Sequence, residues 1–284
     1  MNYNFFLKKG DHIGITAPAS DFNKEEFLKG IKLIKDKGYF PVYNGELLEE
    51  SNNYLMKDDE FRKSDFESLL TNKSIKVIIA ARGGYGSIRT LVNSDNKLFL
   101  KNRKLIVGFS DITTFHIFLN KNKIPSLHGP MVAAFLRDKD STDFLFDILS
   151  GKTRQLKYQL SGSSDKITGS ITGGNLAVIT SLIGSEYFYN FKNKIVLLED
   201  LNEPLYKIDR MVMQLKLAGF SPKAIVLGQF LDCGDYNKIE AIFKDNFKNI
   251  PVYSQIEIGH FKSTLSIPFG VKAIIDNGHL YIGL

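Results

Sequence analysis

The first half of the chain alternates short apolar runs with stretches of helical periodicity, and this alternation limits the possible folds more than any other feature. The apolar runs 12–20, 76–81 and 104–109 predict buried strands, and the segments 23–38 and 58–72 have the apolar spacing of amphipathic helices. Buried strands that alternate with helices favour a parallel sheet covered on both faces. We therefore predict an α/β fold whose N-terminal domain is built on a mainly parallel sheet.

The second half is predicted to be richer in strands. The apolar runs 194–199, 224–230 and 251–259 indicate strands, with one clear helix over 203–219. The pair Asn277-Gly278 lies between alternating apolar residues, a pattern typical of a two-residue hairpin. The expected organisation is an N-terminal α/β domain over 1–150, a polar linker over 151–168 and a smaller β-rich domain over 169–284.

Charge and cysteine content argue against several classes of protein. The 37 basic and 31 acidic residues are scattered, and the densest basic stretch, KNRK at 101–104, is too short for a nucleic-acid surface. The single cysteine, Cys233, cannot form an intrachain disulfide, which favours a reducing compartment. We find no signal-peptide pattern and no apolar stretch near the roughly 20 residues that cross a bilayer. We therefore expect a cytoplasmic protein with neither nucleic-acid nor membrane partners.

A serine and an aspartate stand where the apolar run 104–109 meets the next helical stretch. In the sequence Gly108-Phe109-Ser110-Asp111, a tight strand–turn–helix bend would expose the Ser110 hydroxyl at a helix N-terminus, which favours developing negative charge. The familiar pattern for such a nucleophile is G-x-S-x-G, and the second glycine is missing here. Two interpretations stay open: Ser110 is a nucleophile, or Ser110 or Asp111 caps the helix.

A glycine-rich loop follows the apolar run 76–81. In ARGGYGS (81–87), Gly83 and Gly84 would let backbone N–H groups turn inward, as in anion-binding nests. Together with the N–H of Asp111, this loop could form an oxyanion hole, although an ordinary glycine-rich turn also explains it. A nucleotide site is poorly supported, because the loop has neither G-x-x-x-x-G-K-[ST] nor an intact G-x-G-x-x-G.

The second half offers a carboxylate and a base. Glu199 ends an apolar strand, where an unpaired charge is costly to bury. Glu203, by contrast, is explained by an i,i+4 pair with Lys207. A serine nucleophile needs a base, which is most often histidine. Among the five histidines, His128 and His260 both follow apolar runs and both stay open, with His260 slightly favoured.

Six motifs occur in a fixed order along the chain. They are ARGGYG (81–86), VGFSD (107–111), LHGP (127–130), TGGNLAV (172–178), LLEDLNEPLYKIDR (197–210) and IGHFKSTLSIPFG (258–270). Taken together they resemble the serine LD-carboxypeptidase family, which includes the microcin-immunity hydrolases. The resemblance implies a Ser–His–Glu triad of Ser110, His260 and Glu199 in a cleft between an α/β domain and a β-rich, swivelling C-terminal domain. One departure is Leu198, where many relatives carry Trp.

The resemblance also implies an activity. The expected activity is that of a serine carboxypeptidase that releases the terminal D-Ala of murein tetrapeptides through an acyl-enzyme. No metal or other cofactor is expected. A homodimer is expected. Arg82 and Tyr85 are candidate substrate-binding residues, Arg82 through a bidentate contact with a carboxylate. A salt bridge to the neighbouring domain would explain Arg82 as well. Two alternatives remain, which are hydrolysis of peptidyl- or aminoacyl-nucleotide toxins and a murein-peptide binding module without catalysis.

Overall fold

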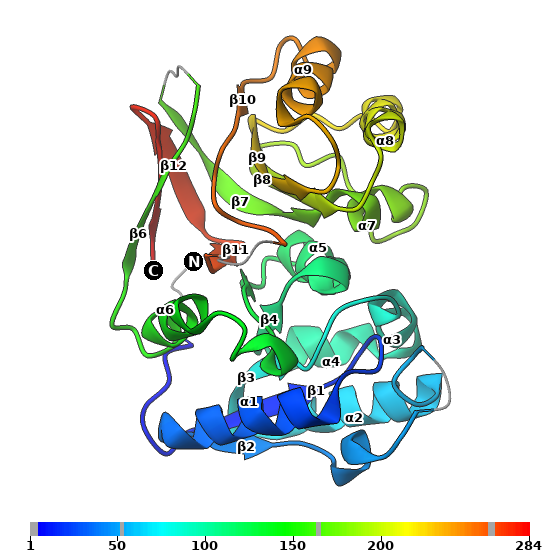
Figure 1. The fold of residues 1–284 in the computed structure, drawn as a ribbon, viewed down its shortest axis with the longest axis vertical. Coiled ribbons are helices and arrows are strands. Elements are labelled where there is room, and N and C mark those ends of the chain that lie inside the picture. The colour runs from blue at the N-terminus through cyan, green and yellow to red at the C-terminus, as the bar shows by residue number, and fades with distance from the viewer. Residues whose placement is uncertain (1–4, 52–53, 163–165, 261–264) are drawn as a thin grey trace.

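The computed structural model describes residues 5–51, 54–162, 166–260 and 265–284, which fold into two lobes with a β-sheet in each (Figure 1). The strands of the first sheet are β1 (His12–Thr16), β2 (Phe40–Val42), β3 (Ile75–Ala80), β4 (Leu105–Gly108), β5 (Ser126–His128) and β11 (Ile267–Phe269). Within the described ranges their order is β11-β5-β4-β3-β1-β2. Neighbours from β1 to β5 run parallel and β11 pairs antiparallel with β5. The predicted parallel sheet is therefore confirmed.

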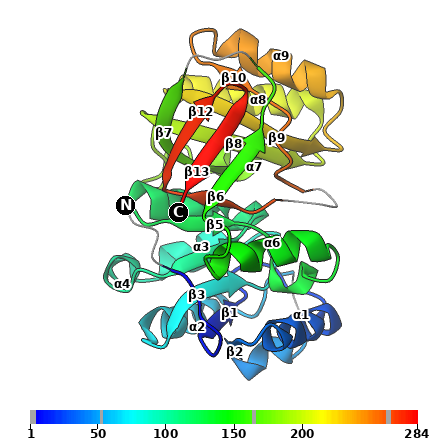
Figure 2. The same cartoon turned by 90° about the vertical axis from the view of Figure 1, so that its left-hand side faces the viewer.

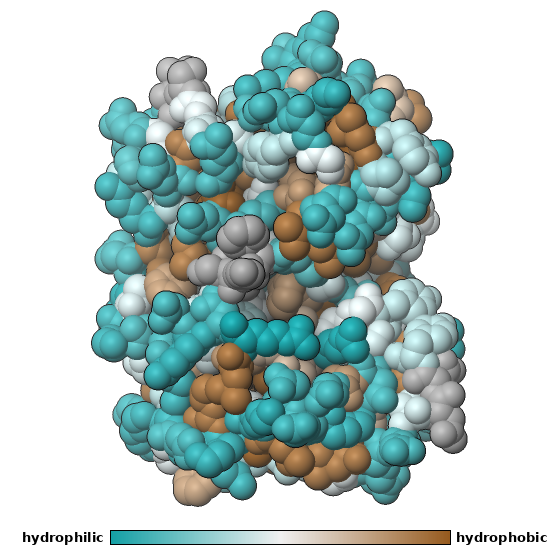
Figure 3. Space-filling model, viewed as in Figure 1, coloured by the Kyte–Doolittle hydropathy of each residue, from teal (hydrophilic) through white to brown (hydrophobic). Residues whose placement is uncertain are grey.

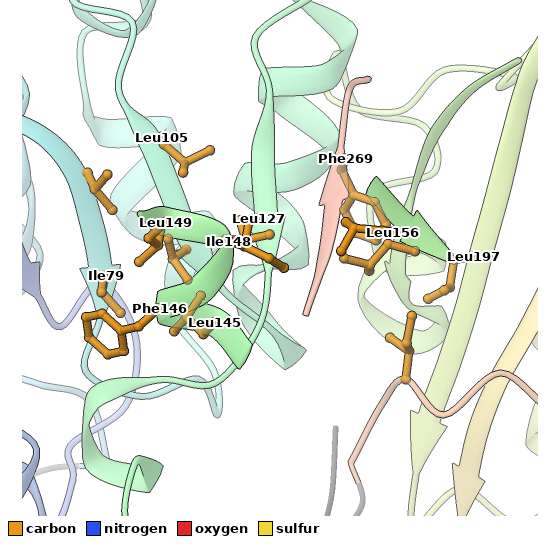
Figure 4. Close-up of a cluster of buried hydrophobic side chains, with 14 of the residues drawn as sticks. Ile79, Leu105, Leu127, Leu145, Phe146, Ile148, Leu149, Leu156, Leu197 and Phe269 are labelled. Atoms are coloured by element: carbon orange, nitrogen blue, oxygen red, sulfur yellow. The ribbon is translucent and has the colours of Figure 1, made fainter. Parts of the chain in front are cut away.

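Helices cover both faces of this sheet. They are α1 (Lys24–Asp36), α2 (Asp59–Thr71), α3 (Ser87–Asn93), α4 (Asn96–Lys101), α5 (Thr113–Lys121) and α6 (Lys139–Leu149), with the 3-10 helices η1 (Gly45–Leu48), η2 (Ser110–Ile112) and η3 (Val132–Ala134). Side chains of β3 alternate between two core clusters because successive strand residues point to opposite faces. Val77 and Ile79 belong to the cluster that includes α1 and α6, part of which is drawn in Figure 4, and Ile78 belongs to the cluster of α2 and α5.

The second lobe has its own sheet. Its strands are β6 (Gln155–Gln159), β7 (Ile167–Asn175), β8 (Lys194–Leu201), β9 (Ala224–Leu231), β10 (Val252–Tyr253), β12 (Lys272–Asp276) and β13 (His279–Gly283). In the described part of the chain their order is β10-β9-β8-β7-β12-β13-β6. The strands β7 to β10 run parallel, whereas β12, β13 and β6 pair antiparallel and lie side by side in Figure 2.

This lobe departs from the sequence prediction in three places. Besides α8 (Leu205–Leu217), the structure has α7 (Leu176–Ser181) and α9 (Tyr236–Asn246), so the expectation of one helix is wrong. The run 251–259 forms only the two-residue strand β10, because Gln255 has a positive φ of 66° that ends the extended conformation. The segment expected as a linker contains β6. None of the helices described here is long and apolar enough to cross a membrane.

The C-terminal part of the chain contributes strands to both sheets. Asn277 and Gly278 have φ of 48° and 71° and connect β12 to β13, which confirms the predicted hairpin. The strand β11 lies between elements of the second lobe in sequence, yet it pairs with β5 at the edge of the first sheet. The chain therefore returns to the first lobe after it has built most of the second.

Candidate active site

The bend after β4 holds Ser110 in an unusual backbone conformation. Ser110 has φ of 60°, which is uncommon for a residue other than glycine, and it opens η2, which leads directly into α5. In this described segment neither η2 nor α5 has a side-chain cap. The carboxylate of Asp111 instead accepts a hydrogen bond from the Ser87 N–H at 2.7 Å. The interpretation of Ser110 or Asp111 as a helix cap is therefore wrong.

The glycine-rich loop between β3 and α3 lies against this bend. A Cβ on Gly83 would be 3.1 Å from Ser110 Cβ and 3.3 Å from its Oγ, so the close approach depends on glycine. Gly84 has φ of 97°, and a Cβ there would be 2.3 Å from Ser20 Oγ. The hydroxyl of Ser87, at the loop's end, donates to the Asp111 carbonyl at 2.6 Å. Among the described residues, the N–H groups of Gly83, Gly84 and Asp111 have no hydrogen-bond acceptor.

Glu199 and His260 form a hydrogen-bonded pair. Glu199 lies near the end of β8 and is fully buried, and its Oε2 is 2.7 Å from His260 Nδ1. Two glycines make room for the carboxylate. A Cβ on Gly259 would be 3.3 Å from Glu199 Oε2, and one on Gly228 would be 3.2 Å from Glu199 Cβ. The C-terminal end of β8 therefore holds the Glu199 carboxylate close to the backbone of Gly228 and Gly259, where it faces the imidazole of His260.

The electrostatic setting favours the charged form of this imidazole. Burial lowers the pKa of His260, but its hydrogen bond to the Glu199 carboxylate and the charges of Glu199 and Asp200 raise it by more, so that the pKa lies above its usual value. Burial raises the pKa of Asp200 itself to about 6, against the opposing effect of its hydrogen bonds. Two neighbouring carboxyl groups thus act on one imidazole.

The alternative base, His128, is placed differently. It is fully buried in β5, and its ring packs against Phe109 with 5.8 Å between ring centroids. Neither ring nitrogen has a hydrogen-bond partner in the described part of the chain, and burial lowers the pKa of His128 well below its usual value. His116 is also buried and its two ring nitrogens contact Ser126 Oγ and the Gly108 carbonyl. Of the two candidate bases, His260 is the one paired with a carboxylate.

Ser110 and His260 line the same pocket, which has a volume of about 380 Å³. The first lobe contributes the bend, the glycine-rich loop and residues around η3, and the second lobe contributes Leu201 and His260. The surface is hollowed between the two lobes in Figure 3. Leu198, the departure from the family pattern noted in the sequence, is fully buried in the core and does not line this pocket.

Two arginines face this pocket. Arg82 donates to the Asp21 carbonyl at 2.8 Å, and no carboxylate in the described ranges pairs with Arg82 or Arg137. The interdomain salt bridge considered for Arg82 is therefore absent from the described structure. Arg137 had no signal in the sequence, because only the fold brings the segment after η3 to the pocket. Tyr85 is 48% exposed, packs near Tyr54 and does not line the pocket.

Known proteins resemble this chain along nearly its whole length. Family models of the LD-carboxypeptidase N-terminal and C-terminal domains match residues 13–129 and 168–275. The chain is 28% identical to a probable murein peptide carboxypeptidase of Bacillus subtilis over 95% of this chain and 90% of that protein. It is 28% identical to the microcin C7 self-immunity protein MccF of Escherichia coli, over 95% and 92%. The crystal structure of a muramoyltetrapeptide carboxypeptidase from Oxalobacter formigenes superposes with a TM-score of 0.85 at 26% identity, covering 96% of this chain and 99% of that one.

Proposed function

The chain belongs to the LD-carboxypeptidase family, and on that premise we propose that it is a serine carboxypeptidase that cleaves the terminal D-Ala from murein tetrapeptides. The observation that carries the proposal is one pocket lined by both a serine on a strained bend and the imidazole of a buried carboxylate–histidine pair. Nucleophile, base and orienting carboxylate are the three parts of a serine-hydrolase triad.

The arrangement suggests the role of each residue. Because Nδ1 of His260 contacts Glu199, Nε2 is the nitrogen left to accept the Ser110 proton as Oγ attacks the scissile carbonyl. Glu199 fixes the ring and stabilises the imidazolium that forms. The backbone N–H groups of Asp111 and of Gly83 or Gly84 hold the oxyanion. His260 then returns the proton to the leaving amine of D-Ala, and water hydrolyses the acyl-enzyme.

Pocket charge supports an anionic substrate. Arg82 and Arg137 line the pocket, no acidic residue lines it within the described ranges, and guanidinium groups bind carboxylates in a planar, bidentate geometry. A murein tetrapeptide ends in a free carboxylate, which one of these arginines would bind, and Tyr85 could contact a more distant part of the peptide. We place this reaction in the cytoplasm and expect a homodimer.

The relative MccF supports a second candidate function, which is hydrolysis of an acyl-nucleotide toxin. Mass analysis of the products from a defined murein tetrapeptide and from an aminoacyl-nucleotide would separate the two. We expect D-Ala release to be the faster reaction, and a preference for the nucleotide would reverse the assignment.

A nucleophile variant tests catalysis itself. We expect Ser110→Ala to lower kcat by about 10³-fold or more, whereas Ser181→Ala, at an exposed serine at the end of α7, should leave it unchanged. A wild-type protein that binds the tetrapeptide but never releases D-Ala would favour the binding module.

A further inference from the structure

A buried hydrogen bond joins the two lobes next to the nucleophile. Thr113 is the first residue of α5, three positions after Ser110, and its Oγ1 accepts a hydrogen bond from the Asn175 N–H at 2.9 Å. Asn175 is the last residue of β7 in the second lobe. Thr113 is fully buried and Asn175 is 6% exposed, so water does not compete readily for this contact.

The chain of hydrogen bonds continues to the strand that carries Glu199. The side-chain amide of Asn175 donates to Asp200 Oδ1 at 2.9 Å, and Asp200 directly follows Glu199 in β8. The N–H groups of Leu201 and Ala177 donate to Asp200 Oδ1 and Oδ2 at 2.9 and 3.0 Å. Asp200 is 2% exposed. Consecutive contacts therefore run from the start of α5, directly after the η2 turn of Ser110, to the strand of Glu199.

The glycine pair before Asn175 makes this approach possible. Gly174 has φ of 132°, and a Cβ there would be 2.3 Å from Thr113 Oγ1. Gly173 has φ of 138°, and a Cβ there would be 1.9 Å from the Leu197 carbonyl oxygen. Any larger residue would push β7 away from α5 or from β8. Gly174 is thus explained by packing between the lobes and Gly173 by packing within the second sheet, roles that the catalytic proposal leaves unassigned.

We infer that Thr113, Asn175 and Asp200 form an interlobe clasp that positions Ser110 against the Glu199–His260 pair. The inference rests on the proposed function only in requiring that Ser110 and His260 react together. Proton transfer from serine to histidine needs heavy atoms about 2.6–3.2 Å apart, and small displacements of reacting groups are costly in rate. None of the three clasp residues is among the described residues that line the pocket. They act through other groups and are positioning residues.

The test removes the hydroxyl that crosses between the lobes. Thr113→Val keeps the shape of the side chain but cannot accept the Asn175 hydrogen bond, whereas Thr113→Ser retains the acceptor. We expect Thr113→Val to lower kcat about tenfold or more with KM for the tetrapeptide within about twofold, and Thr113→Ser to restore most of the rate. Thr180→Val is the control for the loss of a buried threonine hydroxyl, since the Thr180 hydroxyl bonds only to carbonyls of α7 among the described residues. It should leave kcat unchanged.

A second readout separates the clasp from the choice of substrate. The rate at which a fluorophosphonate probe labels Ser110 reports its activation by His260 without any peptide. We expect Thr113→Val to slow labelling as much as it slows turnover, and Asp200→Asn to slow both. If the wild type is labelled but releases no D-Ala, the proposed substrate fails and the labelling rates still decide the clasp. Equal labelling rates for wild type and Thr113→Val would overturn the clasp. Equal losses of labelling rate for Thr113→Val and Thr113→Ser would also overturn it. A wild type that is not labelled would overturn both proposals.

Discussion

At the scale of single residues, the buried carboxylate of Glu199 is the most informative group. Its Oε2 contacts His260, but its Oε1 has no hydrogen-bond partner among the described residues. An unsatisfied buried acceptor costs about 1–3 kcal/mol, and a carboxylate kept only for stability would normally have both oxygens satisfied. The arrangement is therefore better explained by a role in orienting and charging His260 than by a structural salt bridge.

The pH dependence of the reaction should report this role. A general base must be neutral, and the pKa of His260 is raised above the ordinary value of 6.5, so kcat/KM should fall as pH drops through a pKa higher than 6.5. Glu199→Gln removes the carboxylate that raises the pKa. We expect the acid limb to move to lower pH and the plateau to fall by about 10²- to 10⁴-fold.

The measurement is kcat/KM for a murein tetrapeptide across the acid limb. Glu203→Gln is the matched control. Glu203 lies between β8 and α8, pairs with Lys207 and does not contribute to the raised pKa of His260. It should leave the limb in place. An acid limb that stays where it is in Glu199→Gln would show that His260 is not the titrating base.

The two pocket arginines should distinguish a carboxypeptidase from a less selective peptidase. A charged hydrogen bond contributes about 1.5–3 kcal/mol, so removing the arginine that holds the terminal carboxylate should reduce kcat/KM about 10- to 100-fold. We expect this loss for Arg82→Ala or Arg137→Ala with a tetrapeptide acid and a much smaller one with the C-terminal amide. Arg103→Ala, at an exposed site away from this pocket, is the control. Equal losses on acid and amide would argue against carboxylate recognition.

At the scale of elements, the sequence predicted those whose signal is local. The strand before Ser110 and the helices α1 and α2 follow from apolar periodicity, and Asn277-Gly278 requires only a turn. The helix α7 was missed because six residues are too few for a periodic pattern. The helix α9 buries only Ile239 and Phe243, so its apolar face is weak. Conformations set by tertiary contacts, such as the positive φ of Ser110 and Gln255, are not encoded in a local pattern.

The strand β7 offers a test of how tightly the elements around the site are packed. Gly173→Ala combines an unfavourable φ of 138° with a Cβ only 1.9 Å from a carbonyl oxygen, and we expect it to lower the free energy of unfolding by about 3 kcal/mol or more. Gly184→Ala is the matched control, since its φ is 90° but no atom lies within 4 Å. It should lose only about 1 kcal/mol through backbone strain. Urea unfolding measures both, and equal losses would show that the contact with β8 relaxes freely.

At the scale of the whole molecule, the two lobes share their cores. Both buried clusters contain residues of each lobe, and in Figure 4 Leu156 of the second sheet lies near Phe269 of β11 in the first sheet. The sequence alone could not choose between His128 and His260. The pairing of His260 with Glu199 and its place in the pocket of Ser110 depend on how the second lobe packs. The resemblance to a family supplied that information, and local chemistry did not.

Shared cores and the return of β11 predict that the lobes unfold together. Without residues 151–284, the first lobe loses β11 from the edge of its sheet and the second-lobe side chains of both clusters. We therefore expect the fragment 1–150 to lack a cooperative unfolding transition. In the full chain, urea-dependent hydrogen exchange of peptides from β3 and β4 should give the same midpoint as peptides from β8 and β9, coincident with loss of activity. Two separated midpoints would mean that each sheet is stable alone. The second lobe could then swivel, as the family resemblance implies, without breaking shared core contacts.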